Sequence, residues 1–189
     1  MNPKHLSKTV EHYTPLEVLA AVRQVLGVIE LDPASSWEAQ RNVGALNYIT
    51  QEGDGLAMSW ASEFGPRSVF LNPPGGKVVN QSVSKLWWEK LVREVYLGHV
   101  SHAIFLAFNL EMLQTTQSCV KPMLDYGLCY PRERLRFLDS QGVPQTSPTH
   151  ANVIAYIPGT INREVEFYRA FSHIGRVNLA AVLSPAQLS

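Results

Sequence analysis

The segment FLNPP, which ends in Asn72, Pro73 and Pro74, has residue types that could activate an amino group. An amino group on an aromatic ring is a poor nucleophile, because its lone pair is delocalised into the ring. Two acceptors that bind its two hydrogens would direct the lone pair at a methyl donor. The Asn72 oxygen supplies one acceptor, and a backbone carbonyl directed by the following proline supplies the other. The alternative is a rigid turn that only ends a strand.

Polar residues follow three short runs that are typical of strands. Asp32 follows VIEL, Asp54 follows a weaker strand, and Asn72 follows SVFL. Open α/β sheets bind ligands outside the carboxyl ends of their strands, so these residues could line one crevice for cofactor and substrate. For each aspartate the alternative is a turn-forming residue at the end of a strand.

Three arginines, Arg132, Arg134 and Arg136, alternate with Leu135 and Phe137 near the middle of the second half of the chain. Alternate positions of a strand share one face, so the arginines are expected to point to the same side. Guanidinium groups in such a row suit contacts with phosphates. The alternative is a solvated sheet face whose arginines pair with nearby carboxylates.

Periodicity and turn residues predict the elements that position these side chains. Helices are expected at residues 15–26, 84–97, 110–117 and 162–172, and residues 34–45 have some helical character. Thr14 and Glu17 form a capping box for the first helix, Pro15 occupies its first position and Gly27 ends it. Strands are expected at residues 28–31, 46–49, 67–71, 100–108, 133–138, 151–157 and 177–183.

This alternation of strands and helices predicts an α/β fold with a mostly parallel sheet. The strands at residues 133–138 and 151–157 are expected to form a late antiparallel hairpin with a long tip. At 189 residues the chain suffices for one compact core, and no linker divides it. We therefore expect a single domain over residues 1–189.

Composition restricts the kind of protein further. A hydrophobic fraction of 46% and a charged fraction of 17% are typical of a globular protein. We expect a cytoplasmic protein that does not enter the membrane, because we find neither a secretory signal nor a long apolar run. Neither the two cysteines nor the six histidines have metal-ligand spacing, so no metal is expected. The net charge is zero, so any contact with phosphates depends on a local basic patch.

The order of short motifs resembles the phage-type DNA N6-adenine methyltransferases, the Dam-like family of bacteriophages and prophages. The motifs are YTP, LDPAS, DGL followed by a tryptophan, FLNPPGG, PRERLRF and SPTHANVIAYI, which together extend over residues 13–157. The resemblance implies a Rossmann-like methyltransferase fold with S-adenosylmethionine as cofactor and DNA as partner. The implied activity is methyl transfer to the N6 amino group of adenine.

The resemblance also implies roles for residues that would bind the cofactor. Tyr13 and Thr14 match the N-terminal motif that lies near the methionine end of S-adenosylmethionine. Asp32 resembles the acid that accepts hydrogen bonds from the ribose hydroxyls or the methionine amine. Asp54 resembles the acid that faces the adenine amino group of the cofactor.

Asn72, Pro73 and Pro74 match the catalytic tetrapeptide of the family, which holds the target amine. The tetrapeptide usually ends in a tyrosine or phenylalanine that stacks on the flipped target base, and this chain has Gly75 there. Trp87 is expected in the core from its helical spacing, so Trp88 is predicted to supply the missing ring. Alternatively, Gly75 could let the backbone approach the cofactor or the base closely.

Two other functions fit the same residues. A methyltransferase acting on RNA or on a protein amide would meet the same two hydrogens on its target nitrogen. A catalytically silent relative that only binds nucleic acid is the second. Gly75 favours that reading, whereas the intact Asn72-Pro73-Pro74 opposes it.

Overall fold

The longest apolar run in the chain forms the central strand of a seven-stranded sheet. This strand, β6 (Val100–Ala107), is buried along its whole length in a computed structural model that describes residues 13–180. A strand covered on both faces needs apolar or small residues at nearly every position. β3 (Arg67–Leu71) lies parallel to β6, and β8 (Val153–Pro158) lies antiparallel to it on the other side.

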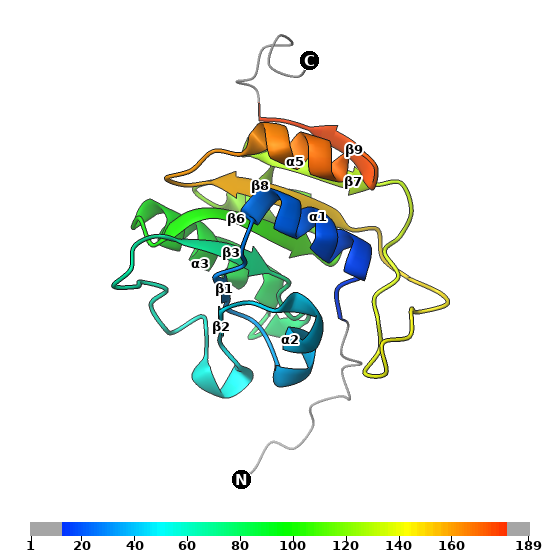
Figure 1. The fold of residues 1–189 in the computed structure, drawn as a ribbon, viewed down its shortest axis with the longest axis horizontal. Coiled ribbons are helices and arrows are strands. Elements are labelled where there is room, and N and C mark those ends of the chain that lie inside the picture. Colours follow the sequence, from blue (N-terminus) through cyan, green and yellow to red (C-terminus); the bar gives the residue numbers. More distant parts are fainter. Residues whose placement is uncertain (1–12, 181–189) are drawn as a thin grey trace.

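The complete strand order is β2-β1-β3-β6-β8-β7-β9 (Figure 1). The remaining strands are β1 (Leu31–Asp32), β2 (Asn47–Tyr48), β7 (Gly127–Pro131) and β9 (Gly175–Asn178). Neighbours from β2 to β6 are parallel, and neighbours from β6 to β9 are antiparallel. The expected α/β fold is therefore confirmed. The sheet is divided between parallel and antiparallel pairs, whereas a mostly parallel sheet was predicted.

Helices cover both faces of this sheet. α1 (Leu16–Leu26) and α5 (Glu164–Phe171) pack on one face, and α3 (Val83–Tyr96) packs on the other (Figure 1). The short elements are α2 (Trp37–Val43), α4 (Glu111–Thr115) and three 3₁₀ turns at Gln51–Gly53, Thr116–Ser118 and Met123–Asp125. Each face has its own apolar cluster because successive side chains of β6 point to opposite sides.

The predicted strand at residues 133–138 is wrong. The antiparallel partner of β8 is β7, which ends at Pro131, and the following residues leave the sheet. Leu135 and Phe137 are nevertheless buried, whereas Arg134 and Arg136, which alternate with them, are exposed. Alternating burial thus arises here in an irregular segment, which the burial pattern alone does not distinguish from a strand.

Most other elements lie close to their predicted positions. The helices predicted at residues 84–97 and 162–172 are α3, which begins and ends one residue earlier, and α5, which is shorter by three residues. The last strand, predicted at residues 177–183, is β9 and begins earlier, at Gly175. Residues 181–183 of that prediction lie outside the described residues.

The predicted base-stacking role of Trp88 is corrected by its burial. Its side chain has no exposed surface, and its indole Nε1 donates to the Lys121 carbonyl at 2.8 Å. The ring meets Phe105 and Tyr126 edge to face, with centroids 5.3 and 5.5 Å away. Trp87, expected in the core, is buried as well. Both tryptophans of α3 therefore belong to the core, and neither ring is available to a flipped base.

Replacing Trp88 with alanine should remove a large fully buried ring. We expect Trp88→Ala to lower the free energy of unfolding by about 3–5 kcal/mol, measured by urea denaturation. Trp37→Ala is the matched control, because Trp37 is 60% exposed and should cost about 1 kcal/mol or less. Similar losses in the two variants would contradict a core role for Trp88.

Candidate functional site

Asn72 and Thr14 meet at the carboxyl end of β3. The Asn72 Nδ2 donates a hydrogen bond of 3.1 Å to the Thr14 Oγ1, across 58 positions of sequence. Thr14 is buried, with 3% of its surface exposed. The bond joins the YTP motif, immediately before α1, to the NPP motif, immediately after β3. Two motifs far apart in sequence therefore share one corner of the molecule.

The predicted capping box at the start of α1 is wrong. The N-cap residue is Pro15, and no side chain caps the helix. The Thr14 hydroxyl is directed to Asn72 instead of to the first turn of the helix. The predicted end of the helix at Gly27 is confirmed, with a φ of 73° that a glycine adopts without strain.

Tyr13 ties a third motif to this corner. Its backbone forms two hydrogen bonds with Leu138, of 2.9 Å from the Tyr13 N–H and 2.8 Å to the Tyr13 carbonyl. Leu138 directly follows the PRERLRF motif. The Tyr13 side chain is buried. The start of the described chain is thereby held beside the segment that follows β7.

The two prolines after Asn72 differ in their surroundings. Pro73 is buried and Pro74 is exposed. The Pro74 carbonyl accepts a hydrogen bond of 3.4 Å from the Ser84 hydroxyl in the first turn of α3. The Pro73 carbonyl is the one whose direction the Pro74 ring restricts, so it is the candidate for the second acceptor.

Gly75 has open space where a side chain would be. A Cβ built there would meet no atom within 4 Å, so packing within the described residues does not require glycine. The chain then forms an exposed hairpin of β4 (Lys77–Val78) and β5 (Gln81–Ser82). The position that carries an aromatic ring in the resembled family is therefore open on this side of the corner.

Asp32 lies at the carboxyl end of β1 and is 3% exposed. Its carboxylate accepts hydrogen bonds from the Ala34 N–H at 3.4 Å and from the Gln40 Nε2 at 2.9 Å. Burial nevertheless raises the pKa of Asp32 to about 6, because the hydrogen bonds only partly offset desolvation. The Asp32 carboxyl is thus costly to ionise in this structure.

Asp54 is exposed and has the turn-forming role that was its alternative. Its Oδ1 accepts hydrogen bonds from the backbone N–H groups of Leu56 and Ala57, both at 3.2 Å. The next residue, Gly55, lies against the LDP motif, since a Cβ at Gly55 would lie 2.0 Å from the Pro33 carbonyl oxygen. This close approach requires glycine and brings the Asp54 loop to the end of β1.

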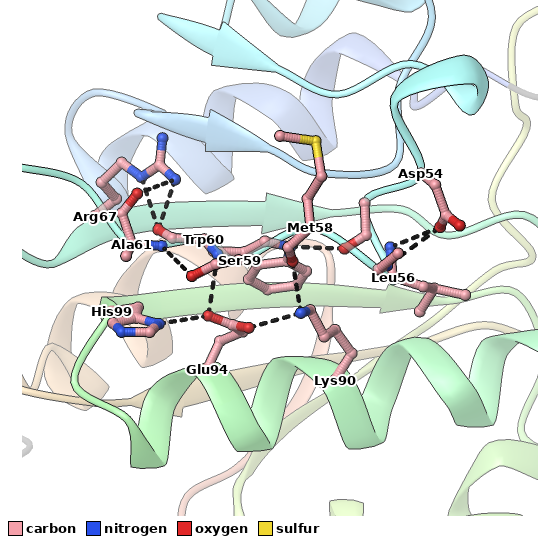
Figure 2. A network of polar contacts seen from close by, with 12 residues as sticks. Asp54, Leu56, Met58, Ser59, Trp60, Ala61, Arg67, Lys90, Glu94 and His99 are labelled. Carbon is pink, nitrogen blue, oxygen red and sulfur yellow. Dashed lines mark hydrogen bonds and ion pairs between the residues drawn. The ribbon is translucent and has the colours of Figure 1, made fainter.

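A buried charge network holds that loop against α3, and Figure 2 shows its members. Trp60 is fully buried and its Nε1 donates to the Gly55 carbonyl at 2.8 Å. The Trp60 backbone N–H donates to the Glu94 carboxylate at 3.1 Å, and the Arg67 guanidinium donates to the Trp60 carbonyl at 2.6 Å. The backbone N–H and the backbone carbonyl of Trp60 are therefore each bound by a charged side chain.

Glu94 is the centre of this network and lies within the apolar stripe of α3. Lys90 and His99 each contact its carboxylate at 2.7 Å. Burial opposes its ionisation, but hydrogen bonds from Lys90, His99 and the Trp60 backbone outweigh burial and lower the pKa of Glu94. Glu94 was not among the predicted site residues. The available signal was its spacing from Trp87 and Leu91, which matches the buried positions of the helix.

The three arginines do not form the predicted strand face. The Arg132 guanidinium donates to the carbonyls of His173 and Ser172 at 2.7 and 3.0 Å. Arg134 donates to the Pro148 carbonyl at 3.3 Å, and Arg136 is exposed. The segment after Pro131 is irregular, so the side chains are directed to different parts of the molecule.

Asn152, in the SPTHAN motif immediately before β8, binds both the end of β6 and the irregular segment after β7. Its Nδ2 donates to the Phe108 carbonyl at 2.8 Å, and its Oδ1 accepts from the Leu135 N–H at 3.2 Å. The His150 ring lies 4.7 Å from the Phe108 ring, centroid to centroid. Asn152 was not among the predicted site residues. The motif therefore connects the irregular arginine segment with the end of β6.

Comparisons of the chain with models of known protein families, with curated proteins and with solved structures found no match. Within residues 13–180, no helix has both the length and the apolar character of a membrane span. In the same range, histidine, cysteine and acidic side chains nowhere gather in threes in a way that could hold a metal ion.

The raised pKa of Asp32 predicts a specific pH dependence of stability. The folded pKa of about 6 exceeds the ordinary value of 3.8, so the stabilisation is complete below pH 3.8 and is lost as pH rises through 6. We expect wild type to lose about 3 kcal/mol relative to Asp32→Asn between pH 3.5 and 7, measured by urea unfolding. Asp125→Asn, which removes an exposed carboxylate, is the matched control. Parallel stability curves for wild type and Asp32→Asn would contradict the burial argument.

Proposed function

We propose that the protein transfers the methyl group of S-adenosylmethionine to the N6 amino group of adenine in DNA. On this proposal the α/β fold is that of a Rossmann-like methyltransferase. The observation that carries the proposal is the hydrogen bond between Asn72 and Thr14. It unites the YTP and NPP motifs, which are two of the motifs that carry the resemblance to DNA adenine methyltransferases. A turn that only ended β3 would not need this bond.

The acids at the strand ends fit S-adenosylmethionine, which when bound supplies an electrophilic methyl group on a positively charged sulfur. Asp32 and Asp54 would hold it, because carboxylates accept hydrogen bonds from ribose hydroxyls and from amino groups. The close approach of Gly55 to Pro33 supports a shared role, since it brings the two acidic segments together. A positively charged ligand would also favour the ionised form of Asp32.

Asn72 would orient the target amine. The donation from its Nδ2 to Thr14 holds the amide, and Oδ1 would accept one N–H of adenine. The Pro73 carbonyl would accept the other. With both hydrogens bound, the nitrogen lone pair is directed at the methyl carbon. The new N–C bond forms as the S–C bond breaks, sulfur keeps the electron pair, and the nitrogen then releases a proton to water.

The open position at Gly75 is compatible with a flipped base. A base that leaves the duplex loses its stacking and needs a new contact surface. The buried rings of Trp87 and Trp88 do not provide it. On this proposal the base lies over the exposed Pro74-Gly75 segment, and its ring contacts differ from those of the resembled family.

Loss of the Asn72 amide should slow methyl transfer strongly while the fold persists. We expect Asn72→Ala to lower kcat by about 10²–10³, the usual effect of removing one preorganised polar contact. Asn47→Ala is the matched control, since Asn47 is an exposed asparagine of β2 and should keep wild-type activity. The measurement is transfer of labelled methyl groups to DNA, with N6-methyladenine identified by mass spectrometry.

The same assay separates the proposal from its alternatives. RNA and protein are offered in parallel, and label in RNA or protein alone would assign the activity to those substrates. Equal background labelling by wild type and Asn72→Ala on all three would mean that the protein is a catalytically silent relative.

The Thr14 hydroxyl provides a second, independent prediction. Thr14→Val keeps the shape of the side chain but removes the acceptor for Asn72. We expect kcat to fall about tenfold with little change in KM, and stability to fall by about 1 kcal/mol. Thr14→Ser keeps the hydroxyl and should retain most of the activity. If the serine and valine variants were equally active, Thr14 would not position Asn72.

A further inference from the structure

A cavity of about 660 Å³ lies between the end of β7, α5 and β9. Its lining includes Tyr130, Arg132, Tyr168, Gly175 and Arg176. A Cβ at Gly175 would lie 2.0 Å from the Tyr130 carbonyl oxygen, so glycine lets β9 approach β7 closely here. The volume is within the range of pockets that bind small ligands or parts of larger ones.

The cavity carries two positive charges and no negative one. Arg132 and Arg176 line it, and none of the lining residues is acidic. Within residues 13–180 neither arginine forms an ion pair. The bonds from Arg132 to the Ser172 and His173 carbonyls fix its guanidinium without neutralising it, and they leave other N–H donors of the group available. Such a pocket suits an anion.

The polar groups around these arginines are of the kind that bind phosphate. Tyr130 and Arg176 are direct partners across the β7–β9 ladder. A tyrosine hydroxyl is protonated at neutral pH and can donate, and burial raises the pKa of Tyr130 further above its ordinary value. Tyr168 supplies a further hydroxyl group from α5, whereas the Ser172 hydroxyl already donates to the Tyr168 carbonyl. Guanidinium and hydroxyl donors together match the three or four oxygens of a phosphate group.

The cavity lies at the same edge of the sheet as Asn72. Leu71 pairs with Phe105, Leu106 with Ile154, Ile154 with Cys129, and Cys129 with Val177. Asn72 follows Leu71 and is therefore level with Leu106, and through these pairs with Cys129 and Val177. Tyr130 and Arg176 lie one residue further toward the same edge. β7 and β9 are three and four strands from β3, which corresponds to about 14–19 Å at the usual strand spacing. That distance spans about five nucleotides of a duplex.

We propose that this cavity binds a backbone phosphate of the nucleic acid, about five nucleotides from the target base. The inference rests on the proposed function and extends it, because it assigns a phosphate contact outside the NPP corner. Arg132 would then contact a phosphate from this cavity, and not from the strand face that the sequence predicted. Since the net charge of the chain is zero, a local pocket of this kind is what contact with phosphates requires.

Arg176 is the residue to test, because it is exposed and supports no backbone group in the described residues. We expect Arg176→Gln to weaken binding of a labelled DNA duplex about three- to tenfold at 0.1 M salt, measured by fluorescence anisotropy. The slope of log K against log salt should become shallower by about 1. Arg176→Lys keeps the charge and should keep most of the wild-type slope. Arg93→Gln, on the exposed side of α3, is the matched control.

The possible results separate this inference from the proposed activity. If Arg176→Gln binds DNA as tightly as Arg93→Gln, or wild type does not bind DNA at all, the phosphate site is wrong. Methyl transfer by wild type, measured on the same samples, would preserve the proposed activity in the first case. DNA binding that depends on Arg176 without any methyl transfer would support the pocket and contradict the activity.

Discussion

The hydrogen bond between Thr14 and Asn72 is the contact on which the arrangement of the candidate site depends. Each residue lies where a regular element meets a loop, immediately before α1 and immediately after β3. Neither element alone defines the orientation of a side chain at its end. Because both partners are anchored by buried elements, the bond transfers the rigidity of the core to the Asn-Pro-Pro corner. A site built in this way keeps its geometry without a dedicated loop structure.

A second constraint acts on the loop that contains Asp54, which lies beside the end of β1 where Asp32 is found. Between residues 50 and 66 the backbone–backbone hydrogen bonds join residues within the loop. Trp60 and the charged groups around Glu94 connect this loop to α3 (Figure 2). A buried carboxylate is costly unless several donors surround it, and Glu94 has donors from Lys90, His99 and a backbone N–H. Removing one of these donors would leave the negative charge of the Glu94 carboxylate only partly compensated. The network therefore specifies one loop position more sharply than apolar packing would.

The sequence predicted those parts of the fold that depend on local pattern. β3, β6 and α3 lie close to where apolar runs and helical spacing predict them. The two strands are buried within the sheet and the helix packs against it, so their burial follows the local pattern. Prediction failed where a distant partner decides. The Thr14 hydroxyl could bind its own helix or another segment, and only the tertiary fold selects Asn72. Residues 133–138 alternate like a strand, yet the Leu135 N–H is bound by the Asn152 side chain.

The two tryptophans of α3 show why spacing alone misjudged burial. A helix on a sheet usually has one buried stripe, and a neighbouring residue is then expected to face solvent. Here Trp88 packs with Phe105 in the sheet and Tyr126 beyond it, whereas Trp87 stacks on Trp60 in the loop, with centroids 6.4 Å apart. α3 is covered from two sides, so its buried stripe is wide. The loop that contains Trp60 also contains Gly55, which lies against Pro33. The contacts that bury Trp87 therefore also hold the loop of Asp54 beside the end of β1, where Asp32 lies.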